Sequence, residues 1–356
     1  MNTYQISKKF QTREDCINYL EKLRWGKKPI CTYCGSNNTV SIESENRHKC
    51  YNCGTTFSVL IGTIFEASKL ELPKFFMLIS MMLSAKGGIS ASQLARDLGI
   101  TLKSTWFCTM KVRCAMIETI TDLHSVVEAD ESYLGGKPRK KSNYNLATLS
   151  ASKMQTNRPQ RGRGTDKVKV AGMIERDGRV AVKILDKLTA QNLLKMLRNN
   201  VSEEDAVLMT DDFKSYNSFD EYVERFVISH SSEGFAKGKI HVNTIEGFWS
   251  ILKNGIKGNY KALSKKYLPF YLAEFSYKYN RRNLPSLKFE SFMKDALSEH
   301  KCMVCMHPEK EPSKIAYSIE KAPKSNIKKF NTANSIAGKN RRKFTDKKGI
   351  IRRVYE

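Results

Sequence analysis

Residues 126–136 read VVEADESYLGG, and this stretch decides how the middle of the chain folds. Two β-branched residues lead into acids, after which an aromatic residue and two glycines bend the chain. The pattern predicts a strand over Ser125–Ser132 that carries Asp130 near its end. A carboxylate in this place can face a cleft, although an acid at the end of a strand is, by itself, often only a helix cap.

A second stretch farther along the chain has the same arrangement. Residues 207–216, VLMTDDFKSY, predict a buried strand over Ala206–Thr210 followed by Asp211. Two strands that present acids at one edge of a sheet can hold two Mg²⁺ ions roughly 3.5–4 Å apart, a geometry that serves phosphodiester chemistry. Glu131 and Asp212 adjoin these acids, and strand alternation predicts that they turn away from the same metals.

The segment between the two acids alternates strand and helix. We expect strands at Lys167–Glu175 and Val180–Leu185, joined as a hairpin across residues 176–178, and then a helix over Ala190–Asn199. Ahead of them, residues 137–165 contain eight Lys or Arg and no acid. This composition indicates a basic loop, which is either a solvated linker or an arm that holds phosphate.

Residues 241–253, HVNTIEGFWSILK, predict an amphipathic helix. Four apolar side chains share one face at helical spacing, and the polar face carries Asn243, Glu246, Ser250 and Lys253. Glu246 lies two turns before the lysine, which places Lys253 on the same face to meet a phosphate. The alternative is a coincidence of spacing on an ordinary surface helix.

The sequences CTYCG at 31–35 and CYNCG at 50–54 give the spacing C-x2-C-x15-C-x2-C. Two such knuckles supply four thiolates to one tetrahedral Zn²⁺, and the glycine after each pair permits the tight turn of a knuckle. Because this stretch has no large apolar core, metal binding would contribute most of its folding free energy. We therefore predict a structural zinc ribbon rather than a redox pair, with the ligands Cys31, Cys34, Cys50 and Cys53.

Residues 89–106, ISASQLARDLGITLKSTW, predict two helices around a turn at Gly99. In a helix-turn-helix unit, the second helix presents its first residues to base edges in the major groove of DNA. Lys103 and Ser104 occupy those positions here. A plain helical hairpin within a bundle is the alternative.

The overall charge of the chain also points to a polyanionic partner. Its 356 residues include 61 Lys and Arg against 36 Asp and Glu, a formal net charge of +25. Nucleic acid is the first partner to consider, and a merely soluble basic protein is the alternative. No signal peptide or membrane span is predicted. In a reducing compartment, the nine cysteines are expected to be metal ligands or buried thiols.

Taken together and in this order, these stretches resemble the zinc-ribbon-bearing DDE transposases of bacterial insertion sequences, the group similar to the eukaryotic Merlin elements. The resemblance spans about residues 13–285. It rests on the phrases CTYCGS, HKCYNCGTTFSVLIGTIFE, ISASQLARDLGI, ADESYLGGK, TDDFKSY, HVNTIEGFWSILKNGIKGNY and YLAEFSYKYNRRN. It implies a ribonuclease-H-like catalytic fold in which Asp130 and Asp211 bind metal.

The resemblance also implies a third catalytic position within residues 243–246, followed by Lys253 near substrate DNA. Some relatives use asparagine instead of the third acid, so Asn243 and Glu246 both stay candidates. Glu246 is favoured because Mg²⁺ prefers charged oxygen ligands. The expected ligands of two Mg²⁺ ions, or of Mn²⁺, are Asp130, Asp211 and Glu246, and the expected DNA contacts in this region are Lys253 and Lys257.

We therefore expect a multidomain chain. Residues 1–66 would hold a lead-in helix and the zinc ribbon, and residues 67–120 a helix-turn-helix bundle. Residues 121–290 would form an α/β ribonuclease-H-like domain with a mixed five-stranded sheet and helices on both faces. Residues 291–356 would form an extension with a basic tail, because twelve Lys or Arg follow from Lys321 onward against two acids.

The expected function is DNA transposition. Such a protein binds the inverted-repeat ends of its element, cuts them with Mg²⁺-activated water, and joins the freed 3′-hydroxyl to target DNA. The expected partner is double-stranded DNA, on which the chain assembles as a homodimer or higher oligomer, without a membrane. We expect a cytoplasmic, nucleoid-associated protein in a bacterium, or a nuclear one in a eukaryotic host. The alternatives are a domesticated DNA-binding regulator and a nuclease or resolvase that cuts without joining.

Overall fold

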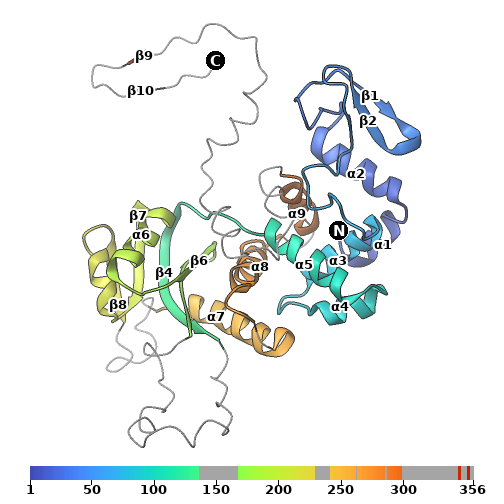
Figure 1. Ribbon diagram of the computed structural model, residues 1–356. Helices are drawn as coiled ribbons and strands as arrows, with labels where there is room; N and C mark the ends of the chain where they lie inside the picture. Colours follow the sequence, from blue (N-terminus) through green and yellow to red (C-terminus); the bar gives the residue numbers. More distant parts are fainter. Residues whose placement is uncertain are drawn as a thin grey trace, which may run out of the picture. The chain divides into compact units, whose positions relative to one another are not determined.

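The computed structural model describes residues 1–135, 167–228, 241–261, 263–284 and 287–298, together with two short paired strands, β9 (Phe344–Thr345) and β10 (Ile351–Arg352) (Figure 1). The chain divides into two compact units, which are Met1–Lys27 with Ser58–Lys321 and Lys28–Phe57 with Ala322–Glu356. The predicted basic loop at 137–165 lies outside the described residues. So does the predicted basic tail, apart from β9 and β10.

The larger unit contains a mixed sheet of five strands. They are β4 (Leu123–Leu134), β5 (Val168–Glu175), β6 (Val180–Leu185), β7 (Val201–Asp211) and β8 (Glu224–Ile228). The strand order is β6-β5-β4-β7-β8. β5 pairs antiparallel with both β4 and β6, β7 pairs in parallel with β4, and β8 pairs in parallel with β7. This is the arrangement of a ribonuclease-H-like fold, so the predicted sheet is confirmed.

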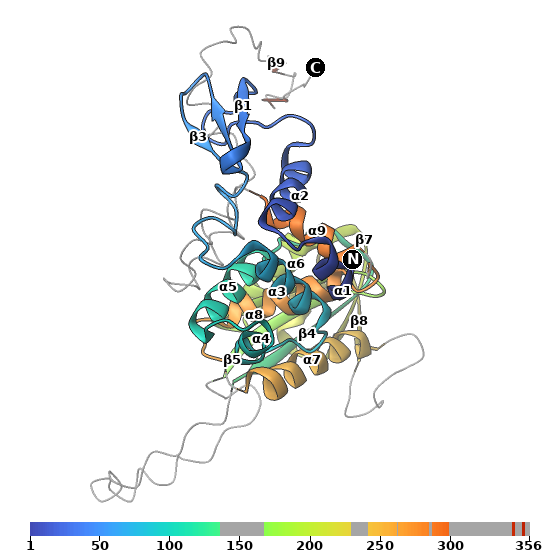
Figure 2. The ribbon, with the colours of Figure 1, turned by 90° about the vertical axis from the view of Figure 1, so that its right-hand side faces the viewer.

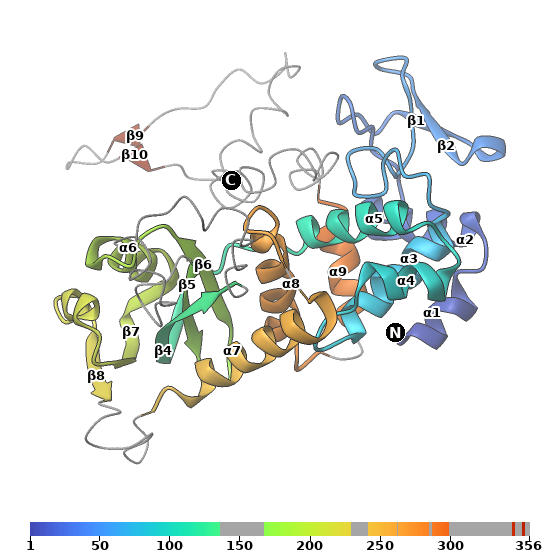
Figure 3. The same ribbon diagram turned by 60° about the horizontal axis from the view of Figure 1, so that its bottom comes forward.

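Helices cover both faces of this sheet, as predicted (Figures 1 and 3). On one face, α6 (Ala190–Asn200) packs with the 3₁₀ segment η5 (Lys214–Phe219) against the side chains of Val127 and Ala129. On the other face, α7 (Asn243–Gly255) and α8 (Leu268–Asn280) pack against Val170 and Ile174. Successive strand residues point to opposite faces, so each strand contributes to both cores.

The smaller unit contains the predicted zinc ribbon. Its strands β1 (Thr39–Ile42), β2 (Arg47–Cys50) and β3 (Thr56–Phe57) form an antiparallel sheet, and the 3₁₀ turn η1 (Glu43–Glu45) joins the first two. Few side chains are buried here. Among residues 28–57 they are Cys31, His48, Cys50 and Phe57. So small a core agrees with a fold that depends on a bound metal.

A separate core in the larger unit is helical and draws on both sides of residue 120. It is shared by α1 (Thr3–Lys9), α2 (Arg13–Trp25), α3 (Leu72–Ser84), α4 (Ala91–Leu98), α5 (Leu102–Ala115), α8 and α9 (Lys288–Ala296) (Figure 2). Phe76 of α3, for example, stacks edge-on against Phe10 and Phe289. Among the described residues, no helix is both long enough and apolar enough to cross a membrane.

Helices α4 and α5 occupy the segment predicted to form a helix-turn-helix unit. Ser90 and Thr101 cap the two helices by accepting the backbone N–H of Gln93 and Ser104 at 3.1 and 3.3 Å. Gly99 ends α4 with a φ of 60°, a left-handed conformation that glycine adopts without a steric penalty. The two helices and the turn at Gly99 are therefore present as the sequence predicts.

A buried ionic cluster joins α5 to α8. Nε of Arg113 lies 2.7 Å from Oε2 of Glu274, and Nζ of Lys278 lies 2.8 Å from Oε1 of the same carboxylate. Tyr260, at the end of the π-helical turn η6 (Ile256–Tyr260), donates its hydroxyl to Glu274 as well. Burial opposes ionisation of Glu274, but Lys278 and Arg113 outweigh it and lower the pKa of Glu274 to about 2.

Glu274→Leu should lower the free energy of unfolding by about 3–5 kcal/mol, because two buried cations would lose their counter-charge. The measurement is the urea unfolding midpoint of the full chain. Glu290→Leu is the matched control, since Glu290 pairs with Lys294 at the surface, where an ion pair contributes roughly 1 kcal/mol or less. Equal midpoints for the two variants would contradict the proposed contribution of the ionic cluster to the free energy of unfolding.

Candidate active site

Asp130 and Asp211 lie beside each other at one edge of the five-stranded sheet. β4 and β7 are parallel neighbours, and their last registered pair is Ala129 with Thr210. The next residue on each strand is the aspartate, so the pairing brings the two acids together. A third acid joins them: one carboxylate oxygen each from Asp130, Glu131 and Asp211 lie within 4.8 Å of one another.

The position of Glu131 differs from the expectation that strand alternation would turn it away. Asp130 contacts α7 on one face of the sheet, whereas Oε2 of Glu131 accepts the hydroxyl of Tyr216, in η5 on the other face, at 2.9 Å. The alternation is therefore present. Both residues stand at the end of the strand, however, and the longer glutamate side chain reaches round to the acids. Asp212 is exposed and is not one of this group.

Trp249 and Gly172 support Asp130, and neither was predicted to do so. The indole Nε1 of Trp249 donates to Oδ2 of Asp130 at 3.0 Å. Gly172 is the residue of β5 that pairs with Asp130. A Cβ at Gly172 would lie 2.7 Å from the indole ring, so the absence of a side chain there lets Trp249 approach the strand. The sequence places Trp249 only on the apolar face of its helix.

The electrostatics of the three acids favour a bound cation. Burial raises the pKa of Asp130 to about 7, and the negative charges of Glu131 and Asp211 act in the same direction. A divalent cation would offset this crowding of charge, and carboxylate oxygens are the ligands that Mg²⁺ and Mn²⁺ prefer. The residues present therefore fit a divalent metal, which Asp130 and Asp211 would hold.

The polar residues predicted on α7 lie on its exposed face. Asn243, Glu246 and Lys253 are all exposed, whereas Ile245, Phe248, Trp249 and Leu252 are buried against the sheet. Glu246 is not one of the three acids whose oxygens lie within 4.8 Å of one another. Lys257 is exposed in η6, one helical turn after Lys253. The structure thus separates the helix into the two faces that the spacing predicts.

The four cysteines of the ribbon come together as predicted. Sγ of Cys31 lies 3.7 Å from Sγ of Cys53, and Sγ of Cys34 lies 3.5 Å from Sγ of Cys50. Four thiolates around a tetrahedral Zn²⁺ with bonds of about 2.3 Å would be separated by about 3.8 Å. The cluster has therefore nearly the dimensions of a zinc site, and its all-sulfur donor set fits Zn²⁺.

The residues predicted to touch DNA on α5 are exposed. Lys103 and Ser104 follow the capping residue Thr101 in the first turn, and Leu102 beside them is 56 % exposed. Ser104 also accepts the Thr101 hydroxyl at 3.0 Å, so part of its hydrogen-bonding capacity serves the cap. Lys103 has no such role among the described contacts.

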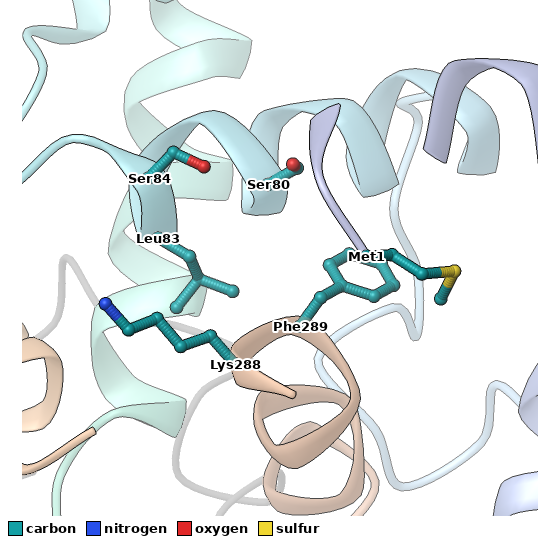
Figure 4. Close-up of a pocket in the computed structure, with 6 residues that line it drawn as sticks. All are labelled: Met1, Ser80, Leu83, Ser84, Lys288 and Phe289. Atoms are coloured by element: carbon teal, nitrogen blue, oxygen red, sulfur yellow. The ribbon is translucent and has the colours of Figure 1, made fainter. Parts of the chain in front are cut away.

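A small pocket lies in the helical part of the larger unit, away from the acids. It is lined by Met1, Ser80, Leu83, Ser84, Lys288 and Phe289 (Figure 4). Burial lowers the pKa of Lys288, and the nearby Lys278 charge adds to the effect. The pocket contains no carboxylate and no cysteine, so it lacks the groups that would hold a metal.

Two parts of the chain match described protein families. Residues 122–280 match the family described as the ISXO2-like transposase domain, and residues 11–56 match the transposase zinc-ribbon domain. An uncharacterized protein in transposable element ISH50 of Halobacterium salinarum is 25% identical over 279 residues, 75% of this chain and 91% of that protein. An uncharacterized transposase-like protein of Haemophilus influenzae is 27% identical over 104 residues, 29% of this chain and 82% of that protein.

Solved structures with similarity to the chain include two complexes of Mos1. A pre-cleavage Mos1 transpososome is 14% identical, with 61% of this chain and 78% of that chain covered and a TM-score of 0.25. The Mos1 mariner paired end complex with Mn is 15% identical over the same shares, with a TM-score of 0.24.

Cys34→Ser should reduce the zinc content of the purified protein by about one ion per chain, because a ribbon zinc needs all four thiolates. The sheet of the larger unit should stay folded, since residues 28–57 belong to a separate compact unit. Elemental analysis and far-ultraviolet circular dichroism measure the two effects. Cys108 is a buried cysteine of α5 outside the cluster, so the control variant Cys108→Ser should contain as much zinc as the wild type. A wild-type protein without zinc would rule out the site.

The raised pKa of Asp130 predicts a pH dependence of stability in the metal-free protein. Between the ordinary value of 3.8 and the folded value of about 7, the folded chain keeps a proton that the unfolded chain has released. The contribution of Asp130 to the free energy of unfolding therefore falls as the pH rises through this window. Urea midpoints at pH 5 and pH 8 test this, and the fall should be smaller in Asp130→Asn. The same fall in both proteins would contradict it.

Proposed function

We propose that this chain, which carries a transposase zinc ribbon and an ISXO2-like DDE transposase domain, cuts the ends of a mobile DNA element and joins them to target DNA. The observation that carries the proposal is the adjacency of Asp130 and Asp211 on parallel strands. Two acids so placed are what metal-dependent phosphodiester chemistry needs. The further likeness to Merlin elements is part of the same proposal.

A bound divalent metal would activate a water molecule or the 3′-hydroxyl of the DNA and would stabilise the leaving oxygen. The side chains of the protein would hold the metal and orient its ligands. Asp130 and Asp211 are proposed to bind the metal, and the indole of Trp249 fixes the rotamer of Asp130 through its hydrogen bond. Glu131, which is tied to Tyr216, adds a third carboxylate to the group.

The third catalytic position is proposed to be Glu246. A charged oxygen suits Mg²⁺ better than an amide does, and a third carboxylate helps to offset the charge of two metal ions. Glu246 lies in the first turn of α7, one turn before Trp249, which contacts Asp130. Lys253 is exposed two turns farther along the same polar face, where an ammonium group can meet a DNA phosphate. Asn243 is then proposed to orient a carboxylate or the DNA.

Other residues, outside the acidic cluster, are proposed to bind DNA. Lys103 and Ser104 would contact base edges at the ends of the element, as the first residues of a recognition helix do. Lys257 would add a phosphate contact beside Lys253, and the net charge of +25 would draw DNA to the protein. Assembly of two or more chains on paired DNA ends is part of this proposal.

The experiment that tests the function uses DNA from both sides of the gene. Duplexes that contain the flanking inverted repeats are incubated with the full chain and Mg²⁺, and nicked and joined products are separated on a denaturing gel. Cleavage followed by transfer to target DNA supports a transposase. Binding without nicking would point to a regulator that has lost catalysis, and nicking without joining would point to a nuclease or resolvase.

Glu246→Gln is expected to abolish both cleavage and strand transfer while binding to the inverted repeats persists, because a neutral amide replaces a charged metal ligand. Asn243→Ala should have the milder effect. The two variants are compared in the same gel assay, with gel-shift affinities as the measure of binding. Near-normal cleavage by Glu246→Gln, together with an inactive Asn243→Ala, would assign the third position to Asn243.

A further inference from the structure

Glu128 is a fully buried carboxylate that the proposed chemistry does not use. It lies on β4, two residues before Asp130. Its Oε2 accepts the backbone N–H groups of Thr244 and Ile245 at 2.8 and 3.0 Å, and its Oε1 accepts the Thr244 hydroxyl at 2.8 Å. Nε of Arg176 lies 2.7 Å from the same Oε1. A strand of the sheet thus holds the first turn of α7.

Arg176 and His241 complete the surroundings of this carboxylate. Nη2 of Arg176 donates to the backbone carbonyl of His241 at 2.8 Å, and Nδ1 of His241 lies 3.3 Å from Oε1 of Glu128. The chain that enters α7 is therefore bound to the same group as the helix itself. A buried carboxylate normally costs free energy, and the guanidinium and the backbone donors offset that cost here.

These contacts suit a helix cap rather than a metal ligand. Both oxygens of Glu128 already accept hydrogen bonds, and it is not one of the three clustered acids. The first N–H groups of a helix lack partners within it, and negative charge is favoured at that end. Val242, the residue just before α7, makes no capping hydrogen bond with its side chain. Glu128, which lies on β4 more than a hundred residues earlier in the sequence, caps the start of α7 instead.

The placement of Glu128 links the two parts of the proposed metal site. Glu128 and Asp130 are two residues apart on β4, so their side chains leave the same face of the sheet. Glu128 binds Thr244 and Ile245, and Asp130 accepts the indole N–H of Trp249. Helix α7 is therefore attached to β4 at two points. Glu246 lies between these points along the helix, and its location follows from both.

We propose that Glu128 is a positioning residue, which sets the register of α7 on β4 so that Glu246 is held at a fixed distance from Asp130 and Asp211. The inference rests on the proposed function, since it assumes a metal site at these acids. A residue that orients the groups around a metal typically changes metal affinity by about 10–100-fold when it is replaced. Metal affinity is therefore the property to measure.

The test measures Mn²⁺ binding to the full, zinc-loaded chain. The electron paramagnetic resonance signal of free Mn²⁺ reports how much of the ion stays unbound. Asp211→Asn gives the background from other sites. Glu128→Gln keeps the shape of the side chain but leaves one acceptor oxygen, and it should weaken Mn²⁺ binding by about tenfold or more. Glu175→Gln is the matched control, because Glu175 is a buried carboxylate on the neighbouring strand β5 that contacts His124. It should bind Mn²⁺ as the wild type does.

Unchanged Mn²⁺ binding in Glu128→Gln, or equal weakening in Glu175→Gln, would overturn the positioning role. If Glu128→Gln does not fold, Thr244→Val removes the hydroxyl donor alone and should shift the affinity in the same direction by a smaller factor; no shift overturns the inference. A wild-type chain that binds no Mn²⁺ above background overturns the metal site itself. If Glu128→Gln alone weakens Mn²⁺ binding but the wild-type chain does not cut DNA, the positioning role is supported and the proposed reaction is overturned.

Discussion

The parallel pairing of β4 with β7 is the constraint on which the candidate site depends. Parallel neighbours end at the same edge of a sheet, so a single register places Asp130 beside Asp211 although the two residues are far apart in sequence. A shift by one residue would turn one of the acids to the other face. The buried side chains along both strands, such as Val127 and Leu208, hold that register because each must reach the core.

Contacts from both faces of the sheet then converge on the end of β4. On one face, α7 supplies the indole of Trp249 to Asp130 and its own first turn to Glu128. On the other, Tyr216 binds Glu131. Asp130 and Glu131, two of the three clustered acids, are thereby attached to elements that pack on opposite faces of the sheet. Burial, together with the negative charges of Glu131 and Asp211, raises the pKa of Asp130, and a divalent cation bound there would offset this cost.

The helical core and the sheet are joined through buried polar groups as well as apolar ones. Glu274 of α8 neutralises Arg113 of α5 and binds Tyr260, which closes the turn after α7. The Asn259 amide of that turn also donates to the Gly87 carbonyl, in the loop before α4, at 2.8 Å. The helices proposed to read DNA are therefore linked to the turn that follows α7 through α8 and through the loop before α4. The Arg113–Glu274 pair is fully buried and therefore has strict geometry, whereas the Asn259–Gly87 hydrogen bond lies at the surface.

The sequence by itself determined those features that depend on neighbouring residues. The spacing of Cys31, Cys34, Cys50 and Cys53, the strands that lead into Asp130 and Asp211, and the two faces of α7 follow from local turn chemistry and periodicity. Only the tertiary structure decided that Glu131 joins the acids, that Trp249 supports Asp130 across Gly172, and that Glu128 caps α7. These contacts join residues that periodicity cannot relate, because they depend on which strands pair and on which face each helix packs.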